Sequence, residues 1–314
     1  MKKLKDSCLV QNVVTLANNA TFPGFQGVSI GTVMAFFHKS ITKGIVMHRA
    51  AAMTYRIFFA LIPLLMSLFA AISFLGSDVR TTIMEFLQAM IPEYVWPTFA
   101  DMIDGVINKQ NGALFYSSLA ISLFSVFISI NASINILNTT YYNIGKRKLL
   151  KQLRVIAMLL FIWMIIILLA VAVFIATSTF LGYIRRQGTD WPRLIPAITH
   201  VAKWLLLFFL VYLFISSFYY LAPATHKHFR FFSAGSTFAT IAMVLVLAVM
   251  NIYFSNFGNY NALYGSLGAV FAILLWLYWN NLVILVGYDL NVSIATAKRA
   301  TLRDTLQKNG NEKK

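Results

Sequence analysis

The stretch YFSNFGNYNALYGSLGAVFAILLWLYWNNLVILVGYDLNVSI, residues 253–294, decides the fold of this chain. An uncharged turn rich in Asn and Gly leads into a long apolar run, which predicts a helix that spans a membrane. The run contains two adjacent amides, Asn280 and Asn281, and one acid, Asp289. Polar groups inside a span are costly, so these three side chains are candidates for function.

The composition extends this prediction to the whole chain. Apolar residues make up 59% of the 314 residues and charged residues 11%, whereas soluble domains carry about 25% charged residues. A globular core cannot bury this much apolar surface, but a bilayer can. The single cysteine, Cys8, excludes an internal disulfide framework and a multi-cysteine metal site.

The apolar segments predict an all-α membrane protein with six spans, at about 50–75, 114–137, 155–183, 200–222, 232–254 and 264–294. Residues 28–48 have apolar positions at helical spacing among basic ones. This pattern predicts an amphipathic helix on the membrane surface, and a helix packed on the bundle is the alternative. Short amphipathic helices are expected between the first two spans. The expected organisation is a tail at 1–27, one membrane domain at 28–297 and a basic cytoplasmic tail at 298–314.

The distribution of Lys and Arg predicts the orientation. If both termini are cytoplasmic, 19 of the 26 basic residues lie on the cytoplasmic side, as the positive-inside rule requires. This asymmetry accounts for most of the net charge of +16, so nucleic acid is not an expected partner. Anionic lipid headgroups on the cytoplasmic side are expected partners.

Glycines and one proline are candidates for packing or bending. Pro63 lies in the middle of the first span, where it removes a backbone hydrogen bond and predicts a kink. Gly258, Gly265 and Gly268 surround the start of the last span. A flexible turn there would gate an opening, and close packing of the helix start is the alternative.

Three blocks of sequence resemble the YihY/BrkB family of bacterial inner-membrane proteins. They are AAAMTY with ALIPLL in the first span, the block from Tyr253 to Val270, and LLWLY with GYDLN in the last span. The resemblance implies a multi-pass inner-membrane protein with a role in transport or envelope function. The family, once labelled ribonuclease BN, usually has Glu at the position of Asp289 and a neutral residue at that of Arg56.

Arg56 and Asp289 are the ionisable side chains predicted to lie deepest in the spans. Both are expected at a similar depth on the cytoplasmic side. They would face a shared cavity, paired or coordinating a solute, and independent snorkelling to the headgroups is the alternative.

A set of amides predicts a polar pathway along the second and last spans. The candidates with Arg56 and Asp289 are Asn131, Asn135, Asn138, Asn280, Asn281 and Asn291. Hydrogen bonding between helices is the alternative for the amides, and the favoured interpretation of the serines of the second span.

These observations favour a transporter or exporter of a small polar, anionic or lipidic solute. The alternative is a non-transporting membrane scaffold or envelope-assembly factor. No nucleophile–base pair, phosphate-binding loop or zinc-protease motif occurs in a cytoplasmic segment. We therefore expect no enzyme, ribonuclease included, and no cofactor or metal.

Overall fold

The computed structural model describes residues 24–76, 111–140, 142, 145, 147–186, 194–224, 230–256 and 266–311, with isolated positions between 80 and 100. Its helices are α2 (Ile30–Lys43), α3 (Val46–Ile72), α6 (Gly112–Asn138), α7 (Leu149–Arg186), α8 (Leu194–Leu221), α9 (Ala234–Asn256) and α11 (Ser266–Asn311). Among the described residues, six helices, all but α2, are long and apolar enough to cross a membrane. The predicted all-α fold with six spans is confirmed.

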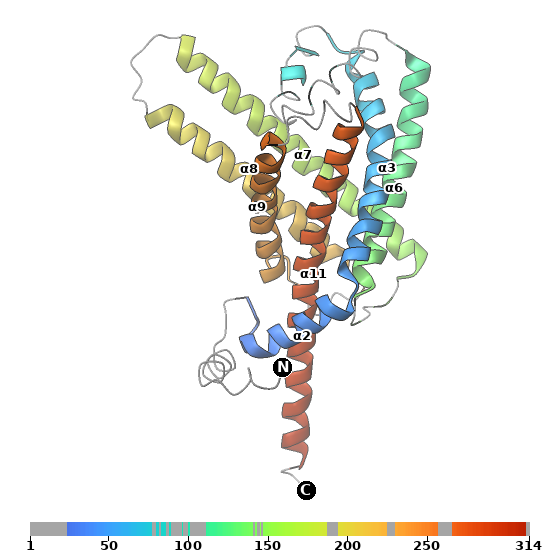
Figure 1. The fold of residues 1–314 in the computed structure, drawn as a ribbon, viewed down its shortest axis with the longest axis vertical. Helices are drawn as coiled ribbons and strands as arrows, with labels where there is room; N and C mark the ends of the chain where they lie inside the picture. Colours follow the sequence, from blue (N-terminus) through green and yellow to red (C-terminus); the bar gives the residue numbers. More distant parts are fainter. Residues whose placement is uncertain are drawn as a thin grey trace.

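The six long helices form three pairs, α3 with α6, α7 with α8, and α9 with α11 (Figure 1). α11 is the central helix, because it also packs on α3 and α2. Almost every residue of α11 from 284 to 295 is buried. A helix buried on all sides cannot show a narrow apolar stripe, which explains why this helix reads as apolar throughout.

The main hydrophobic core lies at one end of the bundle. Its buried apolar side chains come from positions 46–53 of α3, 130–137 of α6, 156–159 of α7, 215–221 of α8, 239 of α9 and 284–292 of α11. We call this the termini end, since α2 and the C-terminal part of α11 also lie there (Figure 1). The opposite end is the far end. All six spans therefore meet at the termini end.

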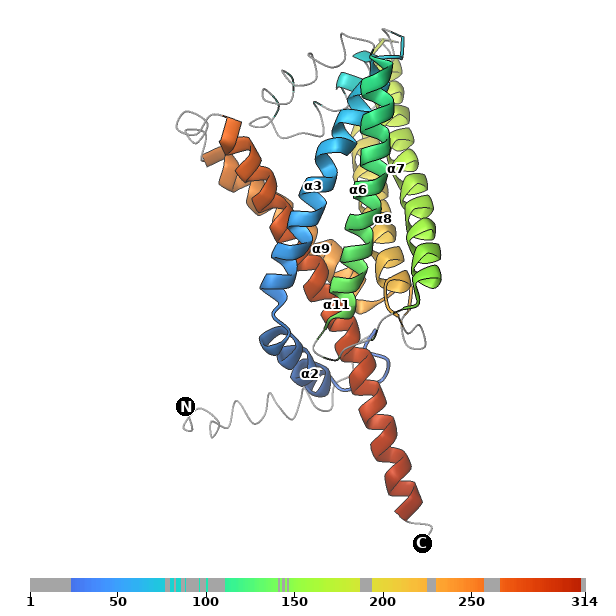
Figure 2. The same cartoon turned by 90° about the vertical axis from the view of Figure 1, so that its right-hand side faces the viewer.

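Toward the far end the pairs separate. Figure 2 shows α9 and α11 leaning away from the four helices α3, α6, α7 and α8. Between residues 201 and 209, α8 is half-buried only at Lys203 and Leu207, and every other position there is exposed. The Lys203 ammonium lies 4.7 Å from the centre of the Phe174 ring on α7, so α8 keeps contact with α7 while its other faces are uncovered. Within a pair, contact continues to the far end, where Met250 and Phe254 of α9 pack on Ala272 of α11.

α2 packs on the bundle. Val33 and the half-buried Phe36 and Phe37 lie against Leu290 and Ile294 of α11. The bundle-packed alternative therefore describes α2, and its placement on a membrane surface stays a prediction. Most of residues 77–110, with the short amphipathic helices expected there, lies outside the described residues.

Two helix ends differ from those predicted from the sequence. α3 begins at Val46 rather than near residue 50, because the chain turns at Gly44 and Ile45, and this places Arg49 inside the helix. α11 continues to Asn311, so the segment expected as a basic tail is largely helical. Residues 296–308 are mostly good helix formers without Gly or Pro, which explains the continuation.

Candidate functional site

A buried ion pair links the first and last spans at the termini end. The Nη1 atom of Arg49 on α3 donates to both carboxylate oxygens of Asp289 on α11, at 3.2 and 3.0 Å. The Asp289 side chain is fully buried and that of Arg49 is 9% exposed. Among the described residues this is the only ion pair. Two charges at this depth are costly unless they pair, so each side chain stabilises the other.

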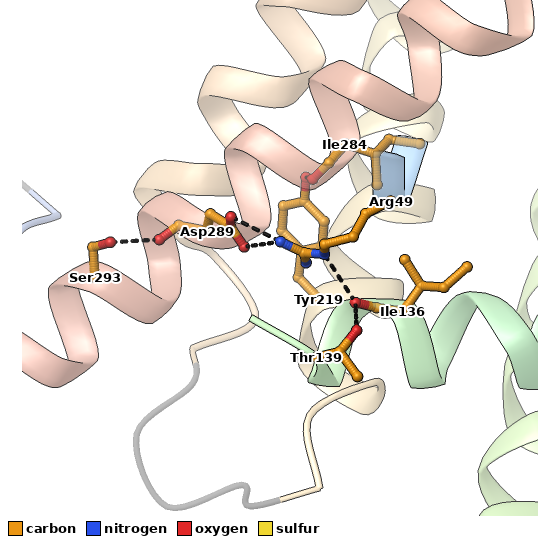
Figure 3. A network of polar contacts seen from close by, with 7 residues as sticks. All are labelled: Arg49, Ile136, Thr139, Tyr219, Ile284, Asp289 and Ser293. Atoms are coloured by element: carbon orange, nitrogen blue, oxygen red, sulfur yellow. Dashed lines mark hydrogen bonds and ion pairs between the residues drawn. The ribbon is translucent and has the colours of Figure 1, made fainter. Parts of the chain in front are cut away.

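Arg49 also ties α6 to the pair. Its Nε atom donates to the carbonyl of Ile136 at 3.2 Å, in the last turn of α6, where carbonyls lack partners within the helix. Figure 3 shows the guanidinium between Asp289 and this carbonyl, which also accepts from Thr139. The third nitrogen, Nη2, is buried and has no hydrogen-bond partner. Arg49 thus joins three helices and still holds one unused donor.

The turn between α2 and α3 sets the position of Arg49. Ile45 adopts a left-handed conformation with φ of 50°, which is strained for a β-branched residue. A Cβ on Gly44 would lie 2.2 Å from the carbonyl oxygen of Ser40 and 3.8 Å from an oxygen of Asp289. The turn therefore passes beside the Asp289 carboxylate, and the fully buried Ser40 lies next to it as well.

Two tyrosines lie near the pair, and a second arginine, Arg147, lies near one of them. The rings of Tyr219 on α8 and Tyr288 on α11 meet edge to face at 5.6 Å, and the Tyr219 hydroxyl donates to the carbonyl of Ile284. Tyr288 lies within electrostatic reach of both Arg49 and Arg147. Arg147, in the turn before α7, donates to the carbonyl of Pro223. Partial burial lowers the pKa of the Arg147 guanidinium, and Tyr288 opposes this shift, but an arginine stays charged.

A close crossing of α9 and α11 lies beside this cluster. Gly235 and Gly287 face each other there, and a Cβ on either would clash with the backbone of the other. Asn291 fixes the crossing, because its Oδ1 accepts from the Gly235 amide at 2.8 Å and its Nδ2 donates to the Ser233 hydroxyl at 2.8 Å. Small residues that allow close helix approach are typical of membrane interfaces.

Arg56 does not pair with Asp289. Arg56 is exposed on α3, and Asp289 bonds to Arg49, seven residues earlier. The pairing considered from the sequence is therefore replaced. The reason is the early start of α3, which brings Arg49 into the helix and next to α11.

The three amides predicted on α6 divide between two contacts. Asn131 and Asn135 both accept from Gln152 of α7, at 3.0 and 3.4 Å. Asn138 is buried and bridges the chain after α8, donating to the carbonyl of Ala222 at 3.0 Å and accepting from the amide of Ala224 at 3.1 Å. These side chains hold neighbouring segments together.

The amides on α11 point to different partners. Asn280 donates to the carbonyl of Trp276 in its own helix at 2.7 Å. Asn281 donates to the Thr54 hydroxyl of α3 at 3.0 Å. Both are buried, whereas Asn131 is half-buried and Asn135 exposed. In the described conformation the six predicted amides make five separate sets of hydrogen bonds, and Asp289 pairs with Arg49.

The predicted kink and packing residues have mixed outcomes. Pro63 lies inside α3, and Gly268 is buried in the first turn of α11. Gly258 and Gly265 lie outside the described residues. In the part of the chain that is described, no group of three His, Cys, Asp or Glu side chains is placed to hold a metal ion.

The sequence interpretation missed Arg49 and Arg147. Arg49 directly precedes the apolar run and was assigned to the cytoplasmic segment. The signal that could have found it is Gly44, because a glycine often ends a helix, and a new helix starting just after it would contain Arg49. For Arg147, which lies in a basic turn, no sequence signal separates it from its basic neighbours.

Comparison with known proteins identifies the family. No curated protein and no solved structure matches the chain. The family model described as "Virulence factor BrkB" matches residues 37–311, which include all six spans, the buried ion pair and the crossing of α9 with α11. This integral membrane protein therefore belongs to the BrkB family, as its resemblance in sequence led us to expect.

Proposed function

We propose that this protein moves an amphipathic solute across the membrane, with the termini end as the closed side of the path. The observation that carries the proposal is the main core at the termini end, from which three helix pairs separate toward the far end. Helices in a bilayer gain little from burying apolar surface against one another. Side chains of α8 uncovered at the far end are therefore compatible with lipid, or a lipid-like solute, between the pairs.

The polar contacts support the same division. Most hydrogen bonds between helices lie at the termini end. There Arg49 joins three helices, and Asn138, Tyr219 and Asn291 each join two elements. Toward the far end, Ser67 and Ser122 join α3 and α6, which already form a pair. The bundle is closed at the termini end, and the helix pairs are separated at the far end. This arrangement corresponds to one state of an alternating-access cycle, in which one group of helices rocks against another.

The orientation and surroundings follow from the charge distribution. We propose that the termini end faces the cytoplasm of a bacterial inner membrane, because most Lys and Arg residues flank that end. Anionic lipid headgroups on that side are the expected lipid partners.

A non-transporting scaffold is the second candidate. The observation that favours it is the use of Asn131, Asn138, Asn281 and Asn291 in hydrogen bonds between separate segments of the chain. A scaffold requires no opening of the termini end, whereas a transporter does. A reversible disulfide cross-link between helices at that end therefore distinguishes a transporter from a scaffold.

The experiment uses Thr54→Cys with Asn281→Cys in a Cys8→Ser background. These side chains are 3.0 Å apart and join α3 to α11. In proteoliposomes containing a fluorescent-headgroup phospholipid, a membrane-impermeant quencher reports lipid movement between leaflets. Oxidation of the pair should stop this movement and reduction should restore it. The control pair, Ser67→Cys with Ser122→Cys, cross-links the permanent pair of α3 and α6 and should leave movement unchanged. Movement that is absent in every variant, or insensitive to the cross-link, supports the scaffold.

A further inference from the structure

We infer that a cavity at the termini end binds the phosphate of an anionic phospholipid, with Arg230 and Lys298 as its cationic partners. Such a site goes beyond the proposed function, because a bound lipid would serve a transporter and a scaffold alike.

The cavity lies where the turn before α2, the segment before α9 and α11 meet. It is lined by Gly24, Gln26, Arg230, Phe232, Ser233, Asn291 and Ile294. Its volume is about 350 Å³ including its open mouth, so a phosphate group can enter it from outside. Asn291, Ile294 and Lys298 follow one another at steps of three and four along α11, and residues at this spacing share one face of a helix. Lys298 therefore extends the wall that α11 gives to the cavity.

Two cations flank this cavity. The Lys298 ammonium donates to the Oε1 atom of Gln26 at 3.2 Å, and because Gln26 lines the cavity, this hydrogen bond places Lys298 at its edge. Gln26 uses one of the three donors of the ammonium. Arg230 lines the cavity directly, is exposed, and has no hydrogen-bond or ion-pair partner among the described residues. None of the described lining residues is acidic, so an anion would meet two cations there without a competing carboxylate.

The level of the cavity along the spans favours a lipid as the source of the phosphate. Phe232 lies two residues before the start of α9, and Ile294 ends the apolar run of α11, so the cavity lies where these spans leave the hydrocarbon core. The Phe232 side chain is 63% exposed, and its ring stacks on that of Tyr212 of α8 at 5.8 Å. An acyl chain can cover this ring, whereas a soluble phosphate cannot. Basic pockets between transmembrane helices on the cytoplasmic side are typical sites for anionic headgroups.

A lipid bound here would also stabilise the crossing of α9 and α11. Asn291 lines the cavity, and the same side chain bonds to the Gly235 amide and the Ser233 hydroxyl. A ligand that binds only the folded state raises its stability. An anionic lipid should therefore raise the unfolding temperature of the protein.

The test measures the affinity of the full-length protein for dioleoyl phosphatidylglycerol by native mass spectrometry from an uncharged detergent. The wild type should bind it more tightly than dioleoyl phosphatidylcholine. Arg230→Gln combined with Lys298→Gln should weaken this binding about thirtyfold, since each basic residue near a headgroup contributes a factor of about five. Arg154→Gln combined with Arg299→Gln is the matched control. It removes two exposed arginines of α7 and α11 that do not line the cavity, and it should bind like the wild type.

Equal losses in the two double variants would indicate general attraction to basic residues and would overturn the site. Equal affinity of the wild type for the two lipids would overturn it as well. Phosphatidylglycerol should raise the unfolding temperature of the wild type and of the control but not that of the site variant, and equal shifts in all three would contradict the site. If the site variant does not fold, Arg230→Gln alone, which removes an exposed side chain, should show the loss of about fivefold, and unchanged affinity overturns the site.

Inorganic phosphate tests the source of the ligand. Added in millimolar excess, it should not displace phosphatidylglycerol, and displacement would assign the cavity to a soluble phosphate and overturn the lipid. The lipid-movement experiment is independent of this result, because its cross-link joins α3 to α11 away from the cavity. Failure of lipid binding therefore does not affect the test of transport, and failure of transport does not affect the test of binding.

Discussion

Gly235 and Gly287 face each other where α9 crosses α11. A Cβ on Gly235 would lie 2.1 Å from the carbonyl oxygen of Gly287, and a Cβ on Gly287 would lie 2.7 Å from that of Gly235 and 2.8 Å from the Tyr219 hydroxyl. In each case the nearest atom is a backbone oxygen, which cannot turn aside as a flexible side chain does. The crossing therefore requires glycine on both helices, and it fixes α9 against the central helix next to the buried ion pair.

The first prediction concerns this crossing. Gly287→Ala should lower the free energy of unfolding by about 1–3 kcal/mol, because the added methyl group forces the two backbones apart. Gly182→Ala is the matched control, since Gly182 also lies in a helix but has no atom within 4 Å of its added Cβ. It should be neutral or slightly stabilising. Unfolding in mixed detergent measures both, and equal effects would contradict the close crossing.

The second prediction separates the two arginines of α3. Arg49→Ala leaves Asp289 buried without its partner and should cost about 3–5 kcal/mol. Arg56→Ala removes an exposed side chain and should change stability by less than about 0.5 kcal/mol. The double variant Arg49→Met with Asp289→Leu should be more stable than either of its single changes, because no buried charge then remains. Thermal unfolding of the purified variants measures this, and simple additivity would argue against direct pairing.

The third prediction concerns the amides of α6. Asn138→Leu removes one buried and one partly buried hydrogen bond to the chain after α8, and it leaves the carbonyl of Ala222 and the amide of Ala224 without these partners. It should cost about 1–3 kcal/mol. Asn135→Leu should be nearly neutral, since Asn135 is exposed and its contact with Gln152 is long, at 3.4 Å. A larger effect at Asn135 would indicate that this side chain has a partner elsewhere, such as a solute.

The fourth prediction concerns the separated far end. In a bilayer, residues 201–209 of α8 should react on most of their faces with a carbene-generating lipid probe. Residues 215–219, which are almost fully buried at the termini end, should not react. Mass spectrometry of the labelled peptides measures the difference. Protection of residues 201–209 would mean that another chain covers this part of α8.

The pattern of apolar residues is sufficient to predict the six spans. Each predicted span overlaps its helix, because a bilayer demands a long apolar run and full backbone hydrogen bonding. The ends of the helices follow a different rule. α3 starts where Gly44 and Ile45 turn the chain, and α11 continues beyond the apolar run because its polar extension consists largely of helix-forming residues. Hydropathy does not carry either signal.

The candidate site is less predictable for a geometric reason. Asp289 stands out because it is an acid inside an apolar run, and the sequence marks it correctly as unusual. Its partner depends on how α3 and α11 cross, which no spacing within one helix determines. Arg56 is the deeper arginine along α3 but faces outward, whereas Arg49 reaches the carboxylate. The same holds for Asn138 and Asn281, whose partners lie on other segments of the chain.

The buried ion pair has a consequence for biosynthesis. Arg49 precedes Asp289 by 240 residues, and ribosomes add about 5–20 residues per second. Arg49 therefore enters the membrane roughly 12–48 seconds before its partner is made. Five spans must wait in the bilayer without their central helix, and the arginine must meanwhile be held by headgroups, water or the insertion machinery. Insertion of the last span then completes the core in one late step, so truncated chains that lack α11 should be substrates for membrane quality control.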